Sequence, residues 1–207
     1  MKIIISDHMG LHRLGCRNAA GARTRRHDEL VTVIANTALT ADPRSFRVAR
    51  EESLPEAEDS QARPGDVALN LGNGRCLVDV TVASPFGVAG QKFTRDAGNP
   101  AAAASNAYNR KMAKWQSLLA NNLLDPEEIG SSFQPLAVTA LGSWDERSLL
   151  WLRKFSDVCA AASGSNKGSA FVELMSRLSV ALWRGNSRLI RALHEPAAEV
   201  DFSLFDE

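Results

Sequence analysis

Two aspartates, Asp66 and Asp79, have the residue type and spacing of a pair that could hold a metal ion. They stand in two short apolar segments, 66–71 and 76–83, with Asn73-Gly74 between them. Asn-Gly between two apolar runs is a strong signal for a β-hairpin. Mg²⁺ prefers oxygen ligands and commonly takes only one or two carboxylates from a protein. The pattern therefore predicts a hairpin that carries a candidate magnesium site.

The geometry of the hairpin decides whether the two carboxylates meet. A two-residue turn at Asn73-Gly74 places Asp66 opposite Thr81. It also places Asp79 opposite Ala68. Because side chains alternate along a strand, the aspartates then share one face as diagonal neighbours about 7–8 Å apart. The opposite face is the expected core side and carries Val67, Leu69, Val78, Val80 and Val82.

Each aspartate also has a simpler interpretation. Asp66 follows Arg63-Pro64-Gly65 and could be an ordinary turn residue. Asp79 lies inside the run Leu77–Val82, where an unpaired buried carboxylate would be costly. It therefore needs a metal, a cation or hydrogen-bond donors, and a functional site remains one of these alternatives.

The elements that must position this hairpin follow from apolar periodicity. A helix is expected from His27 to the stop at Asp42-Pro43, and a second over 101–122 with Tyr108, Met112 and Trp115 on its apolar stripe. The other expected elements are strands at 45–50 and 133–140 and helices at 144–162 and 169–193. The order α-β-β-β-α-β with two further C-terminal helices predicts an α/β or α+β fold with one mixed sheet.

The composition excludes several classes of protein. The 207 residues are 44% hydrophobic and 23% charged, with no apolar run of the length that spans a membrane. Three cysteines and the absence of a signal-peptide pattern predict an intracellular protein, nuclear or cytoplasmic. The 24 basic and 24 acidic residues cancel, but five acids stand in 195–207, so the remaining chain carries 24 bases against 19 acids. This body, at +5, is compatible with binding nucleic acid.

Several segments resemble one family in their order along the chain. The family is the restriction-enzyme-like, or PD-(D/E)XK, endonuclease domain at the C-terminal end of non-LTR retrotransposon polyproteins. The resembling segments are Arg25-Arg26-His27-Asp28, Arg63-Pro64-Gly65-Asp66, Asp79-Val80-Thr81, Pro135–Trp144 and Leu178–Leu182 with Arg184-Gly185-Asn186. The resemblance covers roughly residues 7–193 and implies a restriction-endonuclease-like core.

The resemblance also implies a chemistry, the Mg²⁺-dependent nicking of double-stranded DNA. By it, Asp66 and Asp79 are the metal ligands, and a lysine supports the reaction. Thr81 occupies the usual lysine position, and in these elements the lysine is displaced to the following helix, where Lys111 and Lys114 stand. Lys111 is preferred because it borders the buried stripe, although either could be an ordinary exposed helix lysine. The implied DNA contacts are Arg25, Arg26, His27, Arg63, Lys92 and Arg110.

The resemblance divides the chain into three parts. Residues 1–24 resemble the second half of a Cys/His zinc knuckle, 25–193 the endonuclease domain, and 194–207 form an acidic tail that is expected to be disordered. His12 and Cys16 would be the zinc remnant, but a bound zinc is not expected because no cysteine pair precedes His12.

One further departure from the family's pattern, three further ligand candidates and two rival functions complete the hypothesis. Thr139-Ala140 replaces a glutamate of the family's pattern. Glu29, Glu51 and Glu52 could each add a ligand, although each is more simply a surface residue. One rival is a catalytically inactive nucleic-acid-binding remnant of a reverse transcriptase polyprotein. The other is a protein-interaction module that uses the helices with Trp144 and Trp183.

Overall fold

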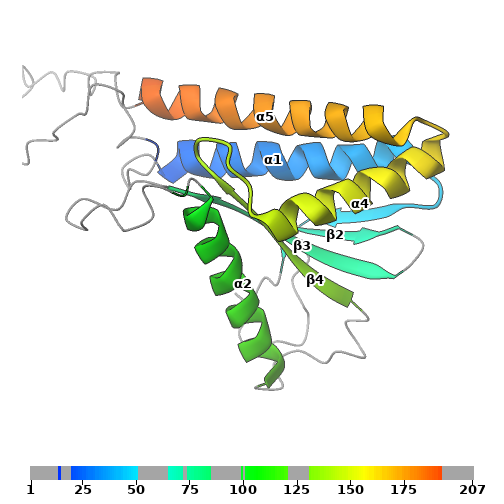
Figure 1. Cartoon of the computed structure of the whole chain (residues 1–207), viewed down its shortest axis with the longest axis horizontal. Helices are drawn as coiled ribbons and strands as arrows, with labels where there is room; N and C mark the ends of the chain where they lie inside the picture. The colour runs from blue at the N-terminus through cyan, green and yellow to red at the C-terminus, as the bar shows by residue number, and fades with distance from the viewer. Residues whose placement is uncertain are drawn as a thin grey trace, which may run out of the picture.

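The computed structural model of the chain describes residues 20–50, 65–71, 74–84, 101–120 and 131–192, together with Leu14 and Asn99. Within them, the elements are α1 (Ala20–Ala41), β1 (Arg47–Arg50), β2 (Val67–Asn70), β3 (Arg75–Ala83), α2 (Ala102–Ala120), β4 (Ser131–Thr139), α4 (Glu146–Ser163) and α5 (Lys167–Ala192). The expected mixed α/β class is confirmed (Figure 1).

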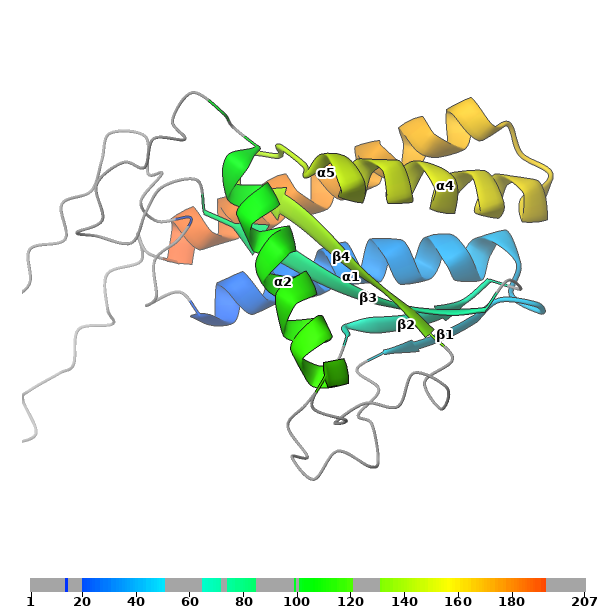
Figure 2. The same cartoon turned by 60° about the horizontal axis from the view of Figure 1, so that its bottom comes forward.

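One four-stranded mixed sheet, in the order β1-β2-β3-β4, organises the molecule. β1, β2 and β3 pair antiparallel, whereas β3 and β4 pair parallel through the crossover that contains α2. α1, α4 and α5 lie on one face and α2 crosses the other (Figure 2). Because both faces of β3 are covered, its sequence is an almost continuous apolar run. Asp79 interrupts that run on the face toward α2.

The hairpin register differs from the expected one. Ala68 lies opposite Leu77 and not opposite Asp79, so the expected pairing of Asp66 with Thr81 is also wrong by two residues. The reason is that four residues, rather than two, join β2 to β3. A shift of two residues leaves every side chain on its expected face. The predicted apolar face of the hairpin therefore does face the main core.

The first helix begins earlier than expected. α1 starts at Ala20, whereas the apolar pattern predicted a start at His27 and assigned 20–24 to the N-terminal segment. Residues 20–25 are exposed or half-buried and Arg26 is a buried cation, so the added residues carry no apolar period. Their alanines and arginines are nevertheless good helix formers. Arg26 and His27 therefore lie inside a helix and not at its start.

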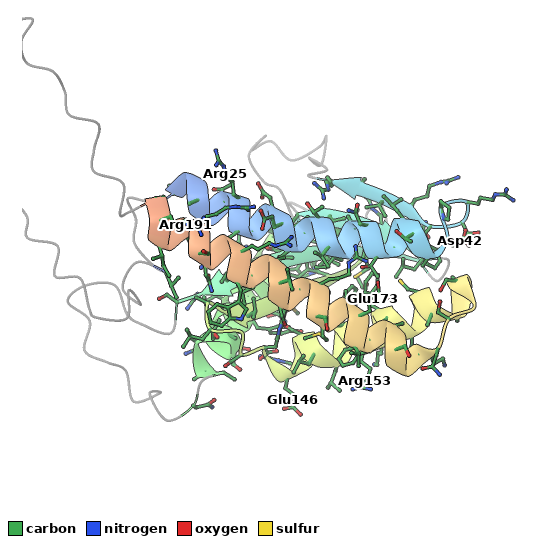
Figure 3. All side chains as sticks on the ribbon, turned by 90° about the horizontal axis from the view of Figure 1, so that it is seen from above. Arg25, Asp42, Glu146, Arg153, Glu173 and Arg191 are labelled. Atoms are coloured by element: carbon green, nitrogen blue, oxygen red, sulfur yellow. The ribbon has the colours of Figure 1, made fainter. Side chains whose placement is uncertain are left out.

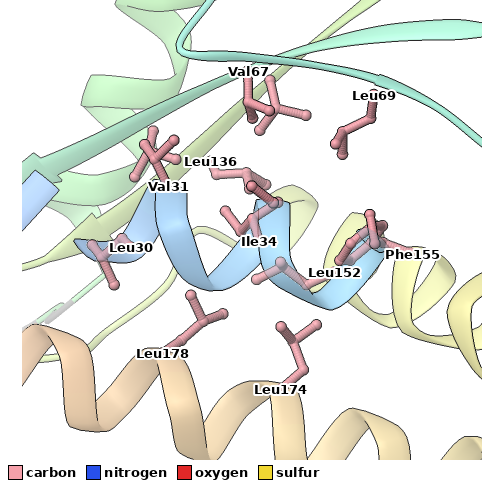
Figure 4. Packing of buried hydrophobic residues seen from close by; sticks show 14 of the residues in the cluster. Leu30, Val31, Ile34, Val67, Leu69, Leu136, Leu152, Phe155, Leu174 and Leu178 are labelled. Carbon is pink, nitrogen blue, oxygen red and sulfur yellow. The ribbon is translucent and has the colours of Figure 1, made fainter. Parts of the chain in front are cut away.

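The main core lies between the sheet and the helices α1 and α4, and continues between these two helices and α5, which packs on them. α1 and α5 run side by side along the molecule (Figure 3). Leu30 and Ile34 of α1, Leu136 of β4, Leu152 of α4 and Leu178 of α5 are fully buried and meet in this core (Figure 4). Burying such side chains is worth about 1.5–3 kcal/mol each. A smaller cluster, in which Trp115 stacks on Phe133 at 4.6 Å, packs α2 on the other face.

Asp145 fixes the start of α4 and supports a testable prediction. Its buried carboxylate accepts hydrogen bonds from the backbone N–H of Arg147 at 3.0 Å and from the guanidinium of the same residue at 3.0 and 3.1 Å. Burial opposes the charge, but the hydrogen bonds from Arg147 and Ser105 outweigh it and lower the pKa of Asp145. We expect Asp145→Ala to lower the free energy of unfolding by about 1–2 kcal/mol at pH 7.

The pH dependence of this loss of stability separates the contribution of the N-cap hydrogen bonds of Asp145 from that of its negative charge. A lowered carboxyl pKa stabilises the fold above the unfolded value, about 3.9, and that stability disappears as the pH falls through the folded value. The difference between wild type and Asp145→Ala in denaturant titrations should therefore shrink below about pH 4. Asp145→Ser keeps a capping oxygen without the charge and should recover part of the loss. A loss that stays constant from pH 7 to pH 3 would contradict this account.

Candidate functional site

The two aspartates of the hairpin lie beside each other on the face toward α2. Asp66 stands directly before β2, and its backbone N–H donates to the carbonyl of Val78 at 2.9 Å. Asp79 is in the middle of β3, where the extended β2–β3 register places it opposite Asp66. Both carboxylates line one cleft, and the charge of Asp66 contributes to the raised pKa of Asp79. The prediction that the pair shares a face is confirmed.

Lys111 joins this pair from α2. Its Nζ lies 2.9 Å from Oδ1 and 2.8 Å from Oδ2 of Asp79. The Asp79 side chain is 11% exposed and that of Lys111 is 37% exposed. The ion pair therefore lies near the surface and not in the centre of the core. Lys114, one turn further along α2, is exposed. The structure therefore distinguishes the two candidate lysines and brings only Lys111 to the aspartates.

His27 approaches the pair from α1. Its Nε2 lies 2.9 Å from Oδ2 of Asp66 and 3.1 Å from the carbonyl oxygen of Val80, and its Nδ1 lies 3.0 Å from Oδ1 of Asp28. Both ring nitrogens thus face acceptors, which suits the imidazolium form. Burial opposes that charge, but hydrogen bonds and charges of Asp66 and Asp28 raise the pKa of His27 to about 9. His27 is therefore a cation at neutral pH.

The surroundings of Asp79 disfavour its ionised form. Burial and then the neighbouring charge of Asp66 raise the pKa of Asp79 above its usual range, and Lys111 opposes this rise. The Asp66 carboxylate has two hydrogen-bond donors, because its Oδ2 accepts from the backbone N–H of Val80 at 2.6 Å and from His27. Two adjacent carboxylates against two flanking cations form a polar cluster whose charges are balanced.

This cluster opens into a cleft of about 330 Å³. Asp66, Asp79 and Lys111 line it, together with His27, Arg23 and Thr81. Thr81 occupies the position, two residues after the second acid, where the resemblance expects a lysine. The threonine and the ammonium of Lys111 border the same cleft, although they come from β3 and α2.

The carboxylate pair is compatible with a hard divalent cation. Mg²⁺ is commonly held by one or two carboxylates and keeps several waters. Asp66 and Asp79 supply such a pair, and a cation between them would relieve the repulsion that raises the pKa of Asp79. Among the residues that the structure describes, no group of three or more His, Cys, Asp or Glu side chains could form a metal site by itself. A divalent cation held here would therefore have only these two carboxylates as ligands among those groups and would complete its shell with water.

Arg26 of α1 also lines the cleft, and it is held in place by Asn186 of α5. Arg26 is 4% exposed, and its Nη1 donates to Oδ1 of Asn186 at 2.8 Å. Asn186 in turn donates to the carbonyl of Ala140 at 2.6 Å. Burial, together with the charge of Arg23, lowers the pKa of Arg26 to about 10, and its Nε has no hydrogen-bond partner. Arg26 was predicted as a DNA contact, whereas its observed partner is an asparagine of α5.

The close approach of α1 and α5 at this point requires a glycine. A Cβ atom built on Gly185 would lie 2.4 Å from Cγ, 2.6 Å from Cβ and 3.0 Å from Cα of Arg26. No side chain can occupy that space without moving the helices apart. The Arg26-His27 and Gly185-Asn186 segments, which the resemblance identified separately, therefore meet at one helix contact.

The remaining predicted residues have the following positions. Arg25 of α1 and Arg110 of α2 are exposed, and Glu29 pairs with Arg188 rather than with the aspartates. Trp144 is partly buried against the main core, whereas Trp183 is 56% exposed. The residues that lie outside the described part of the chain are His12, Cys16, Glu51, Glu52, Arg63 and Lys92.

The sequence interpretation missed two features of this region. It treated His27 as a DNA contact and did not predict its bond to Asp66. It also overlooked the arginines at the end of α5, although their spacing at 184, 188 and 191 places them on one helix face. The spacing of these arginines was the sequence signal that could have identified them as one charged helix face.

Comparison with known proteins adds no family assignment. The chain matches no protein-family model, and a search of curated proteins finds no similar one. Of the helices that the structure describes, none combines the length and the apolar character needed to cross a membrane.

Proposed function

We propose that this protein is a metal-dependent endonuclease that nicks DNA and is related to the restriction-enzyme-like domains of non-LTR retrotransposons. One observation carries the proposal, the convergence of Asp66, Asp79 and Lys111 at a single cleft. These residues come from two strand segments and a helix, and α1 adds His27. A purely structural ion pair would explain Lys111 and Asp79, but not the second carboxylate beside them.

Asp66 and Asp79 are the residues that would hold Mg²⁺ in this function. When bound, the metal would supply a water of lowered pKa and would stabilise the negative charge that develops on the phosphate. The backbone N–H of Val80 and the imidazolium of His27 both contact Oδ2 of Asp66 and fix its orientation. Such supporting bonds to a ligand determine how precisely it is held.

Lys111 provides the positive charge at the opposite side of the pair. It replaces, from α2, the lysine that a sequence of this kind would carry at the position of Thr81. An ammonium at the wall of a partly closed cleft can stabilise the charge of a pentavalent phosphate more strongly than it could in open water. Arg23, which also lines the cleft, adds a second cation for the substrate's phosphates.

A nicking assay with the full chain tests the proposal. Supercoiled plasmid is incubated with purified protein and Mg²⁺, and parallel reactions contain EDTA. We expect wild type to produce open circles only with the metal, and Asp79→Ala to lose about 100-fold or more of the rate. Asp157→Ala, which removes a half-buried carboxylate of α4 outside the cleft, is the matched control and should nick like wild type.

The outcomes of this assay are distinct. Equal nicking by wild type and Asp79→Ala would identify a contaminating nuclease, and the enzyme proposal would fail. Absence of nicking by folded wild type with Mg²⁺ or Mn²⁺, together with salt-dependent DNA binding, would identify a non-catalytic nucleic-acid-binding remnant. Absence of both activities would favour the protein-interaction module.

A further inference from the structure

Arginines gather at the end of the molecule where α1 begins and α5 ends. Arg23 and Arg25 of α1 and Arg184, Arg188 and Arg191 of α5 are exposed there. Arg25 and Arg191 lie at this same end of the paired helices (Figure 3). The contact of Arg26 with Asn186 and the ion pair of Arg188 with Glu29 join the two groups across the helix interface. We call these five exposed residues the arginine end.

The arginine end has a strong excess of positive charge. α1 contains no acid from residue 20 to residue 27, and α5 contains none from residue 178 to residue 192. The nearest acids of α1 are already occupied, because Asp28 faces His27 and Glu29 faces Arg188. Among the described residues, no acidic partner contacts Arg184 or Arg191. This local excess is hidden in a chain whose total charge is zero.

The arrangement of these charges fits a linear polyanion. Arg184, Arg188 and Arg191 follow one another at i, i+4 and i+7, so they form one row along α5. At 1.5 Å per residue the row is about 10 Å long, and about 10 Å of duplex axis carries about six phosphate charges. Arg184 and Arg188 of this row line a groove of about 500 Å³ between α1 and α5, which Arg177, Glu29 and the hydroxyl groups of Thr32 and Ser176 also line.

The arginine end is continuous with the candidate cleft. Arg23 belongs to both, because it lines the cleft that contains Asp66 and Asp79. Arg26 also lines that cleft while it contacts Gly185 and Asn186 of α5. A strand whose phosphate reached the aspartates would therefore pass beside Arg23, the residue that the two sites share.

We propose that the arginine end binds the phosphate backbone of double-stranded DNA and holds it across the entrance of the cleft. The contact is electrostatic and independent of sequence, since guanidinium groups on an exposed row meet phosphates. This inference rests on the proposed function, because it names how that nuclease would hold its substrate.

The test measures binding separately from cleavage. Fluorescence anisotropy of a labelled 30-base-pair DNA duplex is followed in EDTA at several salt concentrations, with the full chain. Arg184→Gln combined with Arg191→Gln removes two charges from the row without breaking the Arg188–Glu29 pair. The matched control, Lys154→Gln combined with Lys167→Gln, removes two exposed lysines, one in the middle of α4 and one at the first residue of α5, both outside the arginine end.

The expected result is a change in the salt dependence of binding. Each phosphate contact adds about 0.9 to the slope of log K against log salt, so the arginine variant should lose about 2 units of slope. Its affinity at low salt should fall about tenfold or more, whereas the lysine control should bind like wild type. Arg184→Lys combined with Arg191→Lys keeps the charges and should restore the slope.

Each alternative result overturns a defined part of the inference. Equal slopes for the arginine variant and the lysine control would show that the row does not contact the backbone. Tighter binding of an RNA duplex of the same length would make the assignment to DNA wrong. The proposed function fails separately, if folded wild type binds DNA with the expected slope but does not nick it with Mg²⁺.

Discussion

Replacement of Lys111 by methionine is expected to lower Mg²⁺-dependent nicking about 100-fold or more, while Lys114→Met should leave it within about twofold. The two lysines stand on the same helix and have the same charge, so they are a matched pair. Only Lys111 contacts a carboxylate of the cleft, with Nζ 2.8 Å from Oδ2 of Asp79. Lys114 is exposed and does not line the cleft.

Loss of Lys111 should also affect the stability of the fold. The Asp79 carboxylate is 11% exposed and lies beside Asp66, so Lys111→Met would leave a largely buried charge without its partner. Leaving such a group unpaired costs about 1–3 kcal/mol, which denaturant titration can measure. A lower activity could therefore come from partial unfolding and not from lost chemistry.

A double variant separates these two explanations. Asp79→Asn combined with Lys111→Met removes the buried charge together with its partner and should recover most of the stability, because no unpaired ion remains. It should still be inactive. Recovery of nicking in this double variant, or an equal loss in Lys114→Met, would show that the cleft is not the catalytic site.

Gly185→Ala is expected to lower the free energy of unfolding by about 1–3 kcal/mol, in spite of the higher helix propensity of alanine. The added Cβ would lie 2.6 Å from Cβ and 3.0 Å from Cα of Arg26. Rotation of the arginine side chain cannot remove these contacts, because both atoms are fixed by the α1 backbone. The two helices must separate, and the 2.8 Å hydrogen bond from Arg26 to Asn186 would weaken.

The matched control is the same substitution on the other helix. A Cβ on Gly21 of α1 would meet no atom within 4 Å. Gly21→Ala should therefore raise the free energy of unfolding by about 0.5–1 kcal/mol through helix propensity alone. Thermal unfolding provides the measurement, since 1 kcal/mol corresponds to about 2–4 °C in a protein of this size. Equal effects of the two substitutions would contradict the close helix contact.

The secondary structure was accessible from the sequence because it depends on local patterns. Apolar stripes with a period near 3.6 predicted both ends of α2, α4 and α5 to within about two residues. The start of α1 was missed, because Ala20 to Arg25 form a helix without burying an apolar face. A segment with this property gives no periodic signal, however favourable its residues are for a helix.

The carboxylate pair was predictable in part. Strand alternation was sufficient to place Asp66 and Asp79 on one face, because this property survives a register shift of two residues. The register itself was wrong, since the length of the connection cannot be derived from the Asn-Gly signal alone. Lys111 was preferred over Lys114 from its place beside the apolar stripe of the helix, and the 2.9 Å contact with Asp79 agrees with that preference.

By itself, the sequence determined the mixed α/β class, the faces of the hairpin and the helix that carries Lys111. These properties follow from periodicity within single segments. Only the tertiary structure decided that His27 binds Asp66, that Gly185 admits Arg26, and that the arginines of α1 and α5 form one end. Arg26 and Asn186 are 160 residues apart, and no local pattern relates such segments. They meet because α1 packs against the sheet and α5 packs its apolar face on α1 and α4, which leaves α1 and α5 adjacent and antiparallel (Figure 1 and Figure 4).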